Sequence, residues 1–233
     1  MMEERKTIMA IGGHVGDAEL TCGGVLASMA LQGYRPITVA LTAGERGNPP
    51  GMTVARYREQ KIREAEEFAG MLGGEAVVLP YCDGELPDTE EVRLQVCDLI
   101  RKYRPKAVMT HWKNSMHKDH MACHRIVLDA QFFAGLASVE RPDKPCFAPL
   151  YYAQNWEDSE GFQPYVYVEV TPEGFALWEK AIATSWFAMN SSSFKYKEYY
   201  SALMRANGIL SRKEYAEAFD IEQYDKKIIR GSL

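Results

Sequence analysis

Five histidines are the side chains of this sequence with the clearest capacity for chemistry, and they are His14, His111, His117, His120 and His124. Asp17 follows His14 by three residues, so an imidazole and a carboxylate can share one site. Zn²⁺ takes imidazole nitrogens and carboxylate oxygens as ligands, and three protein ligands leave one position open for water. Two histidines and one carboxylate also suit Fe²⁺. The residue types therefore indicate a metal site without naming the metal.

The elements that must position these side chains follow from an alternation of short apolar runs with longer amphipathic ones. The apolar runs predict strands over residues 6–12, 36–42, 76–80 and 106–111. Helical spacing predicts helices over residues 18–32, 54–72 and 121–134. Asp88 and Glu91 predict a capping box that opens one more helix. The expected fold class is α/β, with a Rossmann-like, doubly wound, mostly parallel sheet and helices on both faces.

The pattern changes in the last third of the chain. Strands are expected over residues 149–154 and 165–170, and helical stretches over residues 172–189 and 194–204. No repeat, low-complexity tract or linker divides the sequence. We therefore expect one domain over residues 1–233, with a core of about residues 5–140 and a C-terminal elaboration of about residues 141–233.

Ligands of such sheets bind beyond the carboxyl ends of the strands. The loops that follow the first four strands, residues 12–17, 42–51, 81–86 and 111–120, should therefore converge. All five histidines lie in the first or the last of these loops, or within one helical turn of it. This distribution strengthens the expectation of a metal site at that edge of the sheet.

Four segments give the chain a family resemblance. Residues 14–27, HVGDAELTCGGVLA, resemble the signature H-P-D-D-x-E-x-x-x-G-G-x-L-A of the LmbE-like / PIG-L zinc deacetylases. Residues 41–47 (LTAGERG) are similar to the family's L-T-x-G-E-x-G loop, residues 117–120 (HKDH) to its H-P-D-H, and residues 215–219 (YAEAF) to a segment near its C-terminus. The resemblance implies hydrolysis of an N-acetyl group on a glucosamine-containing molecule.

The resemblance also implies roles for individual residues. One Zn²⁺ per chain, or Fe²⁺ in its place, would be held by His14, Asp17 and His120. His117 would be the catalytic residue that faces the scissile carbonyl and protonates the leaving amine, and Asp119 would orient it through a hydrogen bond. We assign substrate binding to Glu45 and Asp83, the latter placed like an aspartate that contacts the sugar. A homo-oligomer is a further implication of the family.

Gly16 is where the sequence departs from the family, because the first aspartate of H-P-D-D is the general base. Loss of a positioned base typically costs about 10²–10⁴-fold in rate. In one hypothesis the His117–Asp119 pair performs both proton transfers, or Glu45 or Glu19 reaches the water. In a second, the reaction differs and the substrate supplies its own base. In a third, the protein binds a metal or glycan and its hydrolysis is weak or lost.

Composition limits the other classes of function. Lys and Arg number 27 against 32 Asp and Glu, a net charge of -5 that disfavours nucleic-acid binding. Five scattered cysteines without a C-x-x-C pair indicate reduced thiols in a cytoplasmic protein. The sequence has no secretory segment and no apolar run of membrane-spanning length, so no membrane role is expected. The predicted partner is a small amino-sugar substrate.

Overall fold

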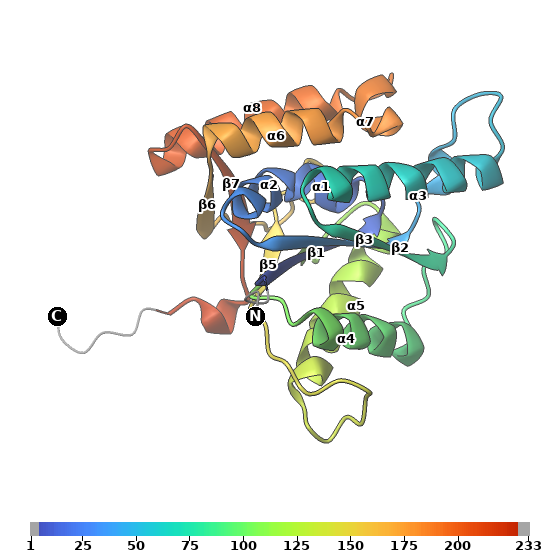
Figure 1. Cartoon of the computed structure of the whole chain (residues 1–233), viewed down its shortest axis with the longest axis vertical. Helices are drawn as coiled ribbons and strands as arrows, with labels where there is room; N and C mark the ends of the chain where they lie inside the picture. Colours follow the sequence, from blue (N-terminus) through green and yellow to red (C-terminus); the bar gives the residue numbers. More distant parts are fainter. Residues whose placement is uncertain (1–4, 228–233) are drawn as a thin grey trace.

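A computed structural model describes residues 5–227 and contains one seven-stranded sheet between layers of helices (Figure 1). The strands are β1 (Thr7–His14), β2 (Arg35–Thr42), β3 (Glu75–Tyr81), β4 (Val108–His111), β5 (Leu150–Ala153), β6 (Val166–Val170) and β7 (Tyr215–Asp220). The helices are α1 (Asp17–Thr21), α2 (Gly23–Leu31), α3 (Val54–Met71), α4 (Glu90–Tyr103), α5 (Lys118–Gly135), α6 (Pro172–Ile182), α7 (Trp186–Asn190) and α8 (Tyr196–Ser211). None of the helices between residues 5 and 227 has the length and apolar character needed to cross a bilayer.

The strand order β3-β2-β1-β4-β5-β7-β6 is that of a doubly wound sheet. Neighbours from β3 through β5 pair in parallel, whereas β7 is antiparallel to both β5 and β6. This arrangement confirms the α/β class and the mostly parallel sheet. The family-like segment at residues 215–219, to which no secondary structure was assigned from the sequence, forms β7.

Two hydrophobic cores cover the two faces of the sheet. Side chains alternate along β1, so that Ile8 and Ala10 join one core while Met9 and Ile11 join the other. The first core lies under α1, α2 and α3, with α6 and α8 packed beyond them, and the second lies under α4 and α5 (Figure 1). Continuous burial of β1 follows from this covering of both faces.

The helix expected over residues 18–32 is two helices, interrupted at Cys22. The side-chain oxygens of Glu217 on β7 accept hydrogen bonds from the backbone N–H groups of Gly24 and Val25, at 2.8 and 2.9 Å. These bonds satisfy two of the N–H groups that a new helix leaves unpaired. The interruption therefore depends on a residue from a distant strand, which local periodicity does not reveal.

The capping box expected from Asp88 and Glu91 is wrong. Helix α4 begins at Glu90 after Thr89, whose side chain makes no capping hydrogen bond. The Asp88 carboxylate instead accepts from Arg125 Nε at 2.7 Å and pairs with Arg93. Two arginine partners outcompete the backbone N–H groups for this carboxylate.

Candidate metal centre

The histidines meet where the strand order reverses direction. After β1 the chain runs outward to β2 and β3, then returns to place β4 on the other side of β1. His14 is the last residue of β1 and His111 the last of β4. A crevice at this reversal is the usual ligand site of such sheets. The four loops expected to converge do so, because residues from each line one cavity or lie directly behind it.

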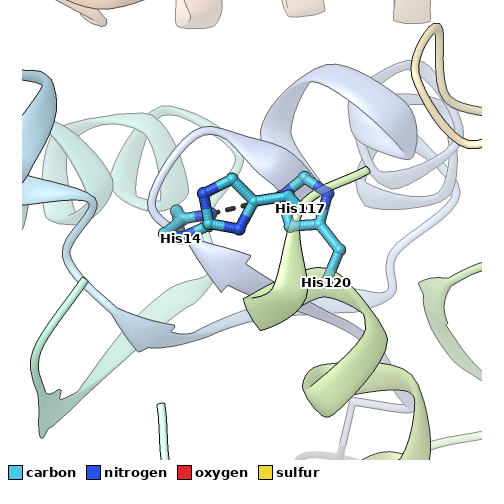
Figure 2. A group of neighbouring side chains, drawn as sticks. All are labelled: His14, His117 and His120. Carbon is cyan, nitrogen blue, oxygen red and sulfur yellow. Dashed lines mark hydrogen bonds between the residues drawn. The ribbon is translucent and has the colours of Figure 1, made fainter. Parts of the chain in front are cut away.

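Three donor atoms form a nearly equilateral triangle at this point. His14 Nδ1 lies 3.2 Å from His120 Nε2, and Asp17 Oδ2 lies 3.3 Å from each of these nitrogens. Ligands of a tetrahedral Zn²⁺ at about 2.0–2.1 Å would be separated by roughly 3.3–3.4 Å. Figure 2 shows His14 facing His120 and His117. Donor atoms of these three histidines also lie within 4.8 Å of one another. The triangle fits one zinc ion with a fourth position left open.

Each of the two histidines in the triangle has a carboxylate at its other ring nitrogen. His14 Nε2 lies 3.1 Å from Asp83 Oδ1, and His120 Nδ1 lies 3.1 Å from Glu157 Oε1. Carboxylates in these positions fix the ring orientation and raise the basicity of a metal-binding imidazole. Asp83, which we assigned to substrate binding, lines the cavity but also contacts His14. Glu157 was not among the residues selected from the sequence.

Electrostatics favour a cation in this cluster. Burial lowers the pKa of His14, but Asp17, Asp119 and Asp83 outweigh it and raise that pKa well above its usual range. Burial raises the pKa of Asp17, yet His120 and His14 hold it well below its usual range. More carboxylates than imidazoles thus share one buried space. A divalent cation would balance this negative charge.

His117 lines the cavity with its ring edge-on to His14, the centroids 4.6 Å apart. Its Nδ1 accepts a hydrogen bond at 3.2 Å from the backbone N–H of Asp119, so His117 caps the start of α5. Burial, together with His14 and His120, lowers the pKa of His117. The imidazole is therefore a side chain that can exchange a proton with a ligand in the cavity.

The Asp119 carboxylate does not make the expected hydrogen bond to the His117 ring within the part of the chain that the structure describes. Its Oδ2 accepts from the backbone N–H of Gly84 at 2.6 Å and lies 3.4 Å from His14 Nε2. The reason is geometric, since residues two apart at the start of a helix point in different directions. Asp119 Oδ1 is buried without a partner in residues 5–227.

Glu45 and Glu19, two further carboxylates in family-like segments, lie behind the cavity wall. Glu45 Oε1 accepts from the backbone N–H of Asp83 at 3.0 Å and lies 3.2 Å from Arg58 Nη1. Glu19 Oε2 accepts from the backbone N–H of Gly16 at 2.9 Å. Both are buried, and neither belongs to the cavity lining. Their positions indicate that they hold loops in place.

The cavity has a volume of about 190 Å³, more than tenfold the roughly 15 Å³ that one water needs. The lining also includes residues that sequence reasoning did not assign to the site, namely Lys61, Asn155, Trp156, Glu157, Phe187, Tyr196 and Tyr200. The loop after β5 supplies three of them. Because β5 is parallel to β4, the rule that selected the other loops could have found this one.

The remaining histidines lie behind the cavity. His111 stacks on His120 with centroids 3.9 Å apart, and its Nε2 lies 3.0 Å from Asp17 Oδ2. His124 Nδ1 donates to the backbone oxygen of His111 at 3.0 Å. Neither ring belongs to the cavity lining, and His111 forms a second possible metal-binding group with Asp17 and His120.

A doubly wound sheet with a His/Asp cluster beside an open cavity at its switch point defines an α/β enzyme of the type that can use a metal ion. The chain belongs to the PIG-L family, described as GlcNAc-PI de-N-acetylase, which matches residues 9–131. The resemblance found in the sequence is thereby confirmed.

Individual relatives have two kinds of activity in their names. The chain is 23% identical to a 4-oxalmesaconate hydratase of Pseudomonas putida over 91% of this chain and 84% of that protein. It is 29% identical to a diacetylchitobiose deacetylase of Thermococcus kodakarensis over 59% of this chain and 54% of that protein. The N,N'-diacetylchitobiose deacetylase of Pyrococcus horikoshii has a similar fold, with a TM-score of 0.79, 21% identity and coverage of 94% and 84%. All three names are those of enzymes, so the hypothesis of a binding protein with lost hydrolysis gains no support.

Proposed function

We propose that the protein is a zinc-dependent hydrolase that removes an N-acetyl group from an N-acetylglucosamine-type amino-sugar derivative. The observation that carries the proposal is the triangle of His14, Asp17 and His120 donor atoms, 3.2–3.3 Å apart, beside a cavity of ligand size. Family membership and a deacetylase relative support the type of reaction. Fe²⁺ would suit the same ligands.

The three residues of the triangle would hold the metal, and Asp83 and Glu157 would orient its two imidazoles. When bound, a Zn²⁺ ion polarises a carbonyl and lowers the pKa of a water molecule. His117, which lines the cavity, would move the protons at its imidazole nitrogens. In this assignment Asp119 acts as a positioning residue that joins the Gly84 loop to His14.

The missing carboxylate at Gly16 leaves His117 as the best candidate for the general base as well as for the acid. Glu19 and Glu45 are held behind the wall by backbone N–H groups, which leaves them poorly placed to take a proton from water in the cavity. A single imidazole can serve in both steps, since the proton taken from water can be returned to the leaving amine. We therefore favour His117 for both transfers.

Hydration of a carbon–carbon double bond is a second candidate function. The aspartate that acts as base in the family signature is replaced by Gly16, and a relative that aligns over 91% of this chain is named a hydratase. Addition of water also needs an activated water and a proton donor, but no leaving amine. Both candidate reactions would use the same metal cluster and the same imidazole.

The deciding experiment combines metal analysis with a substrate screen. We expect close to one zinc per purified chain, lost in His14→Ala, and release of acetate from N-acetylglucosaminides by the zinc-loaded protein. His124→Ala is the matched control, because that ring packs behind the cluster on the backbone of His111. Chains that bind no metal even when zinc is supplied would overturn the proposal. Zinc binding with release of acetate from no N-acetylated sugar would favour the hydratase.

A further inference from the structure

Lys61 is a buried lysine in the wall of the cavity. It lies on α3, its side chain is 3% exposed, and it is the one Lys or Arg among the described residues that line the cavity. Its Nζ donates a hydrogen bond of 2.5 Å to the backbone oxygen of Val15 and lies 5.4 Å from the centre of the Phe187 ring. Neither the metal cluster nor the proposed proton transfers use this cation.

The Lys61 ammonium has N–H donors that make no hydrogen bond within the described residues. An ammonium group has three N–H donors, and the bond to Val15 uses one of them. Within residues 5–227, no carboxylate oxygen lies within 4.0 Å of Nζ, and Val15 is its one hydrogen-bond acceptor. A buried charge without an ion-pair partner is unfavourable unless another group compensates it. Lys61 belongs to the cavity lining, so a ligand in the cavity can provide that group.

Gly16 leaves the space beside this cation open. A Cβ placed on Gly16 would have Lys61 Nζ, at 3.5 Å, as its one neighbour within 4 Å. An aspartate at this position, as in the family signature, would place a carboxylate near the lysine. In this chain the ammonium of Lys61 is present, and position 16 has no side chain. The space beside Gly16 therefore borders the Lys61 ammonium, the one cation of the described cavity lining, whereas Asp17, Asp83 and Glu157 are its acidic members.

We propose that the substrate carries a carboxylate group, which binds in the space beside Gly16 and accepts hydrogen bonds from the Lys61 ammonium. The proposal rests on the proposed function in one respect, that this cavity is the substrate site. The scissile group of the substrate then lies at the His14–Asp17–His120 triangle, and the carboxylate of the substrate lies toward α3. Lys61 is then a determinant of specificity for an acidic substrate.

Neighbouring carboxylates favour the ammonium form of Lys61. Burial lowers the pKa of Lys61, while Glu64, Glu19, Asp17 and Asp83 act in the opposite direction. Glu64 lies on the same helix, Glu19 and Asp17 on α1, and Asp83 on the loop after β3. A substrate carboxylate would add to these charges and favour the ammonium form. Lys118, which follows His117 in sequence, is exposed and outside the cavity lining.

The test measures binding and does not depend on turnover. Malonate, succinate and glutarate, each beside its monoamide, are titrated calorimetrically into the zinc-loaded protein. Each pair has one carboxylate for the metal, and only the diacid offers a second charge to Lys61. The dissociation constant of the diacid of suitable length should be lower than that of its monoamide by about tenfold or more, as expected for one hydrogen bond between charged groups.

Lys61→Met should abolish that preference, and Lys118→Met, the matched control, should keep it. If Lys61 had only a structural role, Lys61→Met would weaken binding of the diacid and of its monoamide equally. The proposal is overturned if the wild type shows no preference at any length, or if folded Lys61→Met retains it. Lys61→Gln replaces the methionine variant if the latter fails to fold. Zinc content and acetate release are measured separately: a chain that binds no zinc would overturn the proposed function, whereas a zinc-loaded chain without the diacid preference would overturn only this inference.

Discussion

The imidazole of His14 and the carboxylate of Asp83 meet with 3.1 Å between Nε2 and Oδ1, joining the end of β1 to the loop after β3. The opposite nitrogen of the same ring faces Asp17 and His120. One ring thus has a carboxylate on one side and the proposed metal position on the other, the arrangement in which a second carboxylate tunes a ligand.

Asp83→Asn should weaken zinc binding by about 10–100-fold, because the amide keeps the shape but removes the charge that makes His14 a stronger ligand. Competition with a chelating dye measures the zinc dissociation constant. Glu85→Gln is the control, since that exposed side chain lies on the same loop as Asp83 and pairs with Arg46. Equal affinities in Asp83→Asn and wild type would remove Asp83 from the metal centre.

His117→Ala should lower kcat by about 10²–10⁴-fold while zinc content stays near one per chain, because His117 would transfer protons and is not part of the donor triangle. The readouts are the rate of acetate release and elemental analysis. Met116→Ala alters the neighbouring residue, which is 77% exposed, and should leave both unchanged. Full activity in His117→Ala would exclude this imidazole from the reaction.

Gly16→Ala should reduce the free energy of unfolding by about 1–3 kcal/mol, since Gly16 has φ of 110°, which L residues rarely adopt. Contact with neighbours is not the cause, because the added Cβ would lie 3.5 Å from Lys61 Nζ. Gly70→Ala, on the exposed side of α3, should leave stability unchanged or raise it by at most about 1 kcal/mol. Urea unfolding measures the change in the free energy of unfolding in each variant. Equal changes in Gly16→Ala and Gly70→Ala would contradict backbone strain at position 16.

Glu217 should make stability fall as the pH rises from about 4.5 towards 8. Burial raises its pKa from 4.5 to about 8, against the opposing effect of the N–H groups of Val25 and Gly24. Because the folded pKa lies above the unfolded one, the stabilisation is complete below pH 4.5 and is lost as the pH passes through 8. The slope relative to Glu217→Gln should approach about 1.4 kcal/mol per pH unit at most.

The measurement for Glu217 is urea unfolding of wild type and Glu217→Gln at several pH values from 4.5 to 9. Glu214→Gln is the matched control, because Glu214 is exposed and only three residues away. Its difference from wild type should be independent of pH. If the stability of the wild type instead rises with pH relative to Glu217→Gln, the pKa of the buried Glu217 carboxyl is not raised in the folded protein, and the prediction is wrong.

A fragment of residues 1–140 should fail to fold cooperatively, since we propose that the whole chain is one domain. Trp178, Tyr200, Met204 and Phe219 all belong to the core cluster that also contains Leu26 of α2. Removing them would expose that core and delete β5, β6 and β7 from the sheet. Circular dichroism during urea titration checks this. A sharp unfolding transition in the fragment would show that the C-terminal elaboration is a separate unit.

Sequence reasoning was most successful where the signal is local. The strand predicted over residues 6–12 and the helix predicted over residues 121–134 are present as parts of β1 and α5, and the order of the loops follows from the parallel sheet. It failed at the break at Cys22 and at the Asp88 cap, where Glu217 and Arg125 from distant elements determine the outcome. Local patterns contain no information on such partners.

The sequence by itself determined the fold class, the family and the residues that could bind a metal, because these depend on residue types and short spacings. Only the tertiary structure decided what surrounds them. It turned Asp119 towards Gly84, put Glu157 behind His120 and brought Lys61 beside Gly16. The direction of a side chain depends on how helices and strands far apart in the sequence pack together. The chemistry of the donor triangle is therefore local, whereas the specificity of the cavity is a property of the whole fold.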